Sequence, residues 1–143
     1  MPVRQLCDEL AVFLRGPHNN IDYVTLSGSG EPTLHSDVGR IIASIKQMTT
    51  VPVAVLTNGS LLHNSEVRRE LKDADIVIPT LAADSETVFQ YVHRGAPSIT
   101  FSRHIDGLVQ FSREFKNHLW IELFLLRGIT AVEKSVSSMN RIY

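Results

Sequence analysis

IDYVTLSGSGEP, residues 21–32, joins a short apolar run to a glycine-rich turn. Residues 21–27 consist mainly of Ile, Tyr, Val, Thr and Leu, the composition of a strand that is covered on both faces. The glycines that follow let the backbone approach a ligand closely, and Pro32 keeps Glu31 extended and outside the next helix. The stretch predicts a buried strand ending in a fixed loop that presents carbonyls and one carboxylate, groups suited to an ammonium.

On both sides of this stretch, apolar runs alternate with segments whose apolar residues recur at helical spacing. Ser36, Ser65 and either Asp84 or Ser85 are suited to cap helices, and Thr130 with Glu133 forms a capping box. Pro79 is expected to stop the third strand. The expected strands are residues 21–27, 51–56, 76–78 and 119–126, and the expected helices are residues 3–14, 36–48, 65–71, 84–92, 102–115 and 130–139.

This alternation predicts an α/β fold with a parallel sheet of about four strands and helices over its outer face. Four strands cannot close a barrel, which takes about eight, so both sheet edges are expected to be open or covered. The chain starts with a helix that no strand precedes, which indicates a missing first strand. A missing N-terminal segment or another chain is the expected cover. No repeat or linker divides the sequence, so residues 1–143 are expected to form a single, partial domain.

Composition limits the function classes. The net charge is −1, which does not indicate a nucleic-acid partner, and no apolar run approaches the roughly 18–20 residues of a membrane span. The single cysteine excludes an internal disulfide and fits a reducing, cytoplasmic location. The six histidines follow no compact metal-binding spacing, so no metal site is expected.

Ligands of parallel sheets bind at the carboxyl ends of the strands. The second expected strand ends at Thr57-Asn58-Gly59, the third at Thr80, and the fourth at Arg127-Gly128. All of these ends are polar, and we expect them to face the same side as the glycine-rich turn.

Two motifs in combination resemble the radical S-adenosylmethionine (radical SAM) superfamily: YVTLSGSGEPTL at residues 23–34 and VAVLTNGSLL at residues 53–62. The likeness runs from about residue 2 to residue 130. It is strongest to iron–sulfur oxidoreductases similar to the tRNA wybutosine-synthesis enzyme. The resemblance implies a partial (β/α) barrel of the radical SAM type. In this superfamily a [4Fe–4S] cluster reductively cleaves S-adenosylmethionine to a deoxyadenosyl radical, which takes a hydrogen atom from the substrate.

The resemblance also implies which residues bind the cofactor. The turn that includes Ser29, Gly30 and Glu31 matches the one that holds the methionine ammonium of S-adenosylmethionine. Thr57 and Asn58 match polar positions lining the cofactor, and Thr80 matches a position near its ribose or carboxylate. The complete set of expected cofactor-binding residues is Gly28, Ser29, Gly30, Glu31, Pro32, Thr57, Asn58 and Thr80.

The sequence departs from the family pattern in two places. The CxxxCxxC cysteines that ligate the cluster are absent, and one thiol, at Cys7, cannot replace three. Thr80-Leu81-Ala82-Ala83 stands where this branch often has Ser-Leu-Asp-Ala, so an acidic position is lost. The resemblance implies an enzyme whose full-length form acts on an unknown substrate, and the missing cysteines imply that this chain alone is inactive.

Two alternatives stay open. The chain could be a non-catalytic module that binds S-adenosylmethionine or another protein. It could also be a Rossmann-type dinucleotide binder that uses residues 28–30, although a third glycine near Thr33 is missing and Pro32 interrupts the start of the helix. Glu122 lies in an apolar strand and is expected either to have a partner or to point into the barrel interior.

Overall fold

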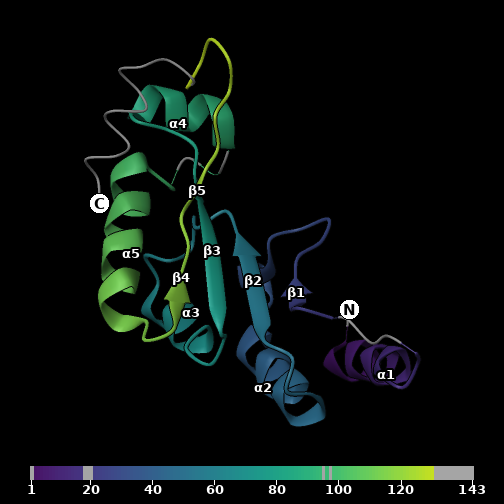
Figure 1. Cartoon of the computed structure of the whole chain (residues 1–143). Helices are drawn as coiled ribbons and strands as arrows, with labels where there is room; N and C mark the ends of the chain where they lie inside the picture. The colour runs from purple at the N-terminus through teal and green to yellow at the C-terminus, as the bar shows by residue number, and fades with distance from the viewer. Residues whose placement is uncertain (1, 18–20, 95, 97, 131–143) are drawn as a thin grey trace.

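The computed structural model describes residues 2–17, 21–94, 96 and 98–130, and Figure 1 shows their path. The expected helix of residues 130–139 lies outside the described residues beyond Thr130. The elements in chain order are α1 (Val3–Leu14), β1 (Val24–Leu26), the 3-10 helix η1 (Pro32–Leu34), α2 (Val38–Met48), β2 (Val53–Thr57), α3 (Ser65–Glu70), β3 (Ile76–Leu81), α4 (Glu86–His93), α5 (Phe101–Glu114), β4 (His118–Leu119) and β5 (Glu122–Leu123).

The strands form one parallel sheet in the order β1-β2-β3-β4, and β5 also pairs with β3. Val24 pairs with Val53 and Ala54 with Ile76, so the first three strands lie side by side in sequence order. This arrangement confirms the expected α/β fold with a parallel sheet. Because the strands are parallel, the loops that follow β1, β2 and β3 all leave from the same edge.

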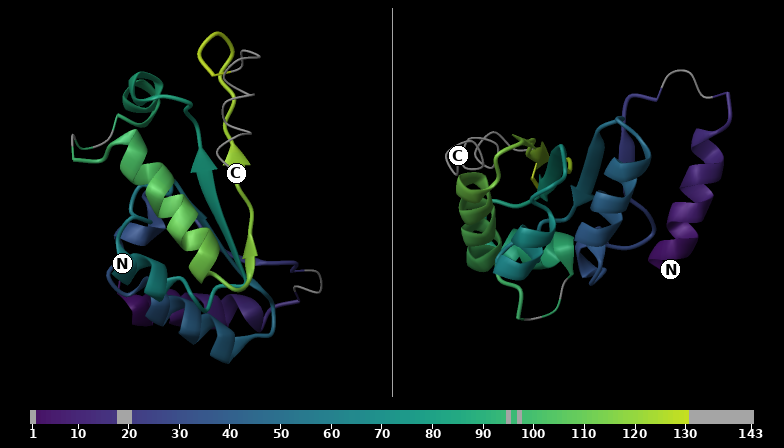
Figure 2. Two further views of the ribbon diagram at one scale, coloured as in Figure 1. Left: turned by 90° about the vertical axis from the view of Figure 1, so that its left-hand side faces the viewer. Right: turned by 90° about the horizontal axis from the view of Figure 1, so that it is seen from below.

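Helices cover one face of the sheet (Figure 2), and the apolar core lies between them and the strands. Ile42 and Ile45 of α2 are fully buried in this core, together with Val55 of β2. Leu56 alternates to the other face of the sheet and is 38% exposed, and Trp120 after β4 is 53% exposed. The face opposite the helices therefore presents apolar side chains to solvent.

The fourth expected strand is not continuous, and the third does not stop at Pro79; both predictions are wrong. β3 runs through Pro79 to Leu81, and residues 119–126 contribute only the short strands β4 and β5. The Val77 carbonyl accepts from Trp120 N at 3.0 Å, and the Leu81 carbonyl from Phe124 N at 3.1 Å. Between them residue 79 would donate to the same side, but proline has no N–H. Pro79 thus interrupts the neighbouring strand instead of its own.

Two helices have an N-cap residue one position away from the expected one, whereas α4 follows Ser85, one of its two expected caps. Asn64, rather than Ser65, caps α3, and its Oδ1 accepts from Glu66 N at 2.9 Å. Asp37, rather than Ser36, precedes α2, and Ser85 precedes α4; neither side chain makes a capping hydrogen bond. Local sequence offers several candidate caps at each site, and the incoming loop decides which of them reaches the first turn.

Arg68 of α3 is a buried cation that fixes the loop before its own helix. Its Nη1 donates to the carbonyls of Leu62 and His63, at 2.9 and 3.1 Å. Its Nε and Nη2 donate to the two carboxylate oxygens of Glu114 in α5, at 2.8 and 3.1 Å. The side chain is 8% exposed, so its hydrogen bonds compensate the loss of hydration. Residues 62–63 are consequently held rigidly against α5.

Within the described residues, no helix combines the length and apolar character that crossing a membrane requires.

Candidate cofactor-binding site

The predicted cofactor residues gather at the carboxyl edge of the sheet. The loop of residues 27–31 follows β1, Thr57 ends β2 and is followed by Asn58 and Gly59, and Thr80 lies near the end of β3. Since β1, β2 and β3 are neighbours in the sheet, these segments meet although up to about 50 residues separate them along the chain.

The Glu31 carboxylate ties the first two of these segments together. Its Oε1 accepts from the hydroxyl of Thr57 at 2.5 Å and from Thr33, whose Oγ1 lies at 2.7 Å and whose N lies at 3.1 Å. Its Oε2 accepts from Asn58 N at 2.7 Å. A carboxylate offers about four acceptor sites, so the capacity left for an ammonium is concentrated on Oε2. Glu31 is first a clamp between strand ends, a role that the sequence did not reveal.

Thr57 connects this clamp to the turn that follows it. Its hydroxyl donates to Glu31 and accepts from Gly59 N at 3.1 Å. Gly59 has a φ of +73°, a left-handed conformation that glycine adopts without strain. The Thr57–Gly59 turn is therefore defined by one hydroxyl and one glycine, and its shape depends on Glu31.

Thr80 and Glu122 extend the polar edge to the last strand. Thr80 Oγ1 donates to Glu122 Oε2 at 2.7 Å and lies 3.5 Å from the Thr57 carbonyl oxygen. A threonine hydroxyl has one proton to donate, and here the shorter contact receives it, so the main hydrogen bond of Thr80 is to Glu122. Glu122 is exposed and pairs across the strands with Thr80, so it belongs to this edge. The sequence placed Glu122 in the sheet, but the strand register determines its partner.

Gly28 and Gly30 leave open space above the loop. A Cβ built on either residue would meet no atom within 4 Å, and neither has a left-handed φ. Neither packing nor backbone conformation therefore requires glycine here. The loop lines a pocket of about 470 Å³ together with Leu6 of α1 and Ile41 of α2. Glycine at these positions would allow another molecule to approach the backbone closely.

Replacing Thr57 by valine is expected to destabilise the fold by about 1–2 kcal/mol, because the clamp loses a donor and the buried Gly59 N–H loses its acceptor. Thr25→Val is the matched control, since Thr25 is exposed on β1 and valine suits a strand. Urea unfolding of both variants measures the difference. Equal stability of the two variants would contradict the role given to the Thr57 hydroxyl.

Outside this set, three polar residues lie in loops or at a helix end. His63 Nδ1 is 2.9 Å from the Ser60 carbonyl oxygen, and Arg94 takes a left-handed conformation (φ 47°) at the end of α4. Asp84 lies in the loop before α4 and is not its cap residue. Among the described residues, no group of three or more His, Cys, Asp and Glu side chains is arranged to hold a metal ion.

A [4Fe–4S] cluster does not fit the residues present. Thiolates are its usual ligands, and the sequence contains one cysteine, Cys7, which is half-buried on α1. The strand-end edge does fit the methionine end of S-adenosylmethionine, because it offers an open glycine backbone and a carboxylate oxygen with one protein partner.

Comparison with known proteins identifies the family and the fold. Residues 5–136 match the radical SAM superfamily. Over 125 residues the chain is 42% identical to a protein of Brachyspira hyodysenteriae named GTPase Obg, a match covering 87% of this chain and 18% of that protein. A UPF0026 protein of Synechocystis is 34% identical over 127 residues, covering 89% of this chain and 47% of the relative. The chain thus spans less than half of either relative.

Among solved structures, a domain of pyruvate-formate lyase-activating enzyme from Bacteroides vulgatus aligns with a TM-score of 0.63 and 22% identity. The alignment covers 83% of this chain and 70% of that one, and it shows a shared fold. Because the superfamily match extends from residue 5 to residue 136 of 143, this chain belongs to the radical SAM superfamily.

Proposed function

We propose that this chain supplies the S-adenosylmethionine-binding edge of a radical SAM barrel, and that the full-length form starts radical chemistry on a substrate. The open backbone at Gly28 and Gly30 carries the proposal, because neither the packing nor the conformation of the protein itself requires glycine there. When bound, a [4Fe–4S] cluster would supply the reducing electron in such an enzyme. Its thiolates would come from outside these 143 residues.

The residues of this chain would bind and orient the cofactor. The carbonyls of residues 28–30 and Oε2 of Glu31 would accept hydrogen bonds from the methionine ammonium. The Glu31–Thr57 hydrogen bond would fix this acceptor set before the ligand arrives, which lowers the cost of ordering it. Thr80, already bonded to Glu122, would lie near the ribose or carboxylate of the cofactor.

The partner proposal concerns the uncovered surfaces of the sheet. In the described part of the chain β1 pairs only with β2, and Leu56, Trp120 and Phe124 are exposed. A further strand from an N-terminal segment, or another chain, would pair with the edge of β1, and a segment packed on the open face would shield these side chains. The cytoplasmic location stays a prediction from cysteine content.

A non-catalytic module that binds S-adenosylmethionine is the second candidate, and the presence of a single cysteine favours it. A Rossmann-type dinucleotide site is disfavoured, because η1 and a further loop separate Gly30 from the start of α2 at Val38. The pyrophosphate of a dinucleotide binds directly at a helix N-terminus, which the glycine loop does not reach.

Calorimetric titration of the chain with S-adenosylmethionine tests the shared part of both candidates. We expect saturable binding that Gly30→Val weakens at least tenfold without lowering stability, because the new side chain occupies only the open space above the loop. Ala43→Val, at an exposed position of α2, is the matched control and should bind like the unaltered chain. Absence of binding by a folded, monodisperse sample would contradict the proposal for this chain.

Turnover separates the two candidates. A longer form containing a cysteine motif should cleave S-adenosylmethionine after cluster reconstitution, as measured by release of 5′-deoxyadenosine. A non-catalytic module would bind the cofactor without cleaving it in either form.

A further inference from the structure

Two histidines behind the strand-end edge are buried without hydrogen-bond partners. His104 of α5 is 0% exposed, and neither its Nδ1 nor its Nε2 has a partner in the described structure. Nε2 of His93, the last residue of α4, is buried in the same way. Buried polar groups without partners are uncommon because each costs about 1–3 kcal/mol. Such a pair therefore calls for a physical explanation.

The surroundings of His104 are apolar rings and backbone. The ring of Phe89 lies 5.2 Å from that of His104 and stacks on that of His93 at 4.3 Å, measured between centroids. The two imidazoles are 5.5 Å apart. In the described chain, His93 is the one titratable side chain whose charge acts on His104. The backbone of Thr80 in β3 and of Gly59 in the turn after β2 also lies near the ring, but neither makes a hydrogen bond of acceptable geometry with it. A charged imidazole would be poorly solvated here.

His104 also directly supports the Thr57–Gly59 turn. A Cβ built on Gly59 would lie 3.0 Å from His104 Cε1 and 3.4 Å from Pro79 Cβ, so the turn rests on the imidazole ring. The same turn donates Asn58 N–H to Glu31. Water can reach the ring nitrogens only if a neighbouring segment moves, and this turn is in direct contact with the ring.

We propose that His104, together with His93, is a positioning residue that supports the Thr57–Gly59 turn while neutral and releases it on taking up a proton. Release of the turn would break the Asn58–Glu31 hydrogen bond and open the clamp between β1 and β2. Burial lowers the pKa of His104 to about 4 and also lowers that of His93, in agreement with this geometry. The inference concerns the turn itself and holds whether or not S-adenosylmethionine binds.

Amide hydrogen exchange by NMR tests this proposal on the unaltered chain. The amides of Asn58, Gly59 and Leu62 are bonded to Glu31, Thr57 and the Gly59 carbonyl, so they report opening of the turn. Opening linked to one proton should make their opening constants rise about tenfold per pH unit below pH 6.5, after correction for intrinsic exchange. Thr49 N–H, at the end of α2, should open by local fraying without this dependence.

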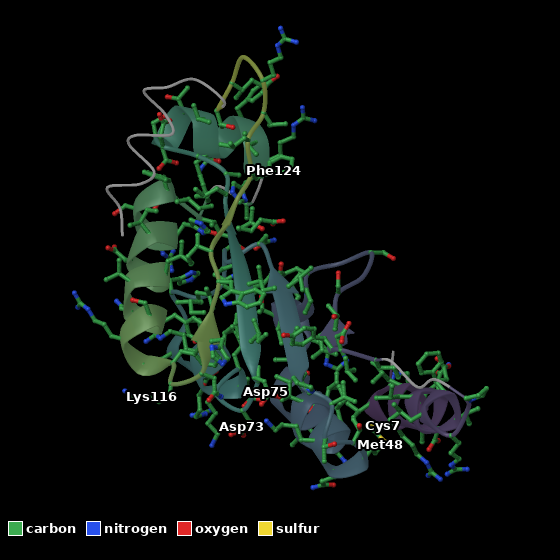
Figure 3. All side chains as sticks on the ribbon, viewed as in Figure 1. Cys7, Met48, Asp73, Asp75, Lys116 and Phe124 are labelled. Atoms are coloured by element: carbon green, nitrogen blue, oxygen red, sulfur yellow. The ribbon has the colours of Figure 1, made fainter. Side chains whose placement is uncertain are left out.

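The His104→Phe variant keeps a ring in place and removes the titration, so its turn amides should lose the pH dependence. His104→Leu is a second variant for the case that phenylalanine does not fit. His118→Gln is the matched control, because His118 lies at the amino end of the sheet beside Asp75 (labelled in Figure 3) and should leave the dependence intact. Opening constants that do not change with pH in the unaltered chain, or an unchanged dependence in the His104 variants, would overturn the proposal.

Discussion

Substituting Gly107 by alanine is expected to lower the free energy of unfolding by at least about 2 kcal/mol. This figure already allows for the roughly 1 kcal/mol by which alanine stabilises a helix relative to glycine. Gly107 lies on the buried side of α5, directly against residues 62–63. A Cβ there would lie 2.5 Å from His63 N and 2.7 Å from the Leu62 carbonyl carbon. Both are backbone atoms, and no rotamer change can relieve the overlap.

Arg68 makes this overlap harder to relieve. It donates to the carbonyls of Leu62 and His63, so moving these residues away from α5 would also break a buried network. Gly28→Ala is the matched control, because its Cβ meets no atom within 4 Å and its φ is not left-handed. We expect Gly28→Ala to remain within about 0.5 kcal/mol of the unaltered chain. Urea unfolding measures both, and a Gly107→Ala protein as stable as the control would show that α5 is not packed as described.

Acidification from pH 7 to pH 4 is expected to lower the free energy of unfolding by about 3 kcal/mol through His104 alone. Burial holds the pKa of His104 at about 4, below the ordinary value of 6.5. Between pH 6.5 and pH 4, the His104 imidazole is protonated in the unfolded chain but neutral in the folded chain. Stability is therefore fully present above pH 6.5 and is lost as the pH falls toward 4, with about 2 kcal/mol gone by pH 5. His93, whose pKa burial also lowers, acts in the same direction.

Two carboxylates make the free energy of unfolding depend on pH in a lower range. The hydrogen bonds and charge of Arg68 lower the pKa of Glu114. Lys46 and the Val53 N–H outweigh desolvation and lower the pKa of Asp75. Their contributions are present above the ordinary carboxyl pKa values and are lost as the pH falls through the lowered ones. The range from pH 6.5 to pH 5 thus isolates the histidines.

Urea unfolding at intervals between pH 7.5 and pH 5 measures this loss. His104→Phe should give a flatter stability profile, and His118→Gln should reproduce the unaltered one. A free energy of unfolding that stays constant down to pH 5 would contradict the burial of a neutral His104. This experiment reports global unfolding, whereas hydrogen exchange reports the local opening of the turn.

Local pattern predicted most of the elements, but the ends of few of them. Helical spacing at Val3, Leu6 and Leu10 predicted α1 with its observed bounds. The parallel pairing followed from strict alternation. The interruption between β4 and β5 was not predictable in this way, because it arises from Pro79, about 40 residues earlier, on the adjacent strand. The β-propensity of a sequence describes each strand separately, whereas the hydrogen bonds between two strands depend on the residues of both.

The sequence by itself determined the α/β order, the superfamily motifs, the absence of a cysteine set for a cluster, and which polar residues end the strands. Only the tertiary structure decided what those residues do. Glu31 meets Thr57 and Asn58, 26 and 27 positions away, and Thr80 meets Glu122, 42 positions away. His104 becomes a buried support for Gly59 only after α5 packs behind the sheet. Periodicity records which face of an element is apolar, but strand register and helix packing determine which polar atoms meet.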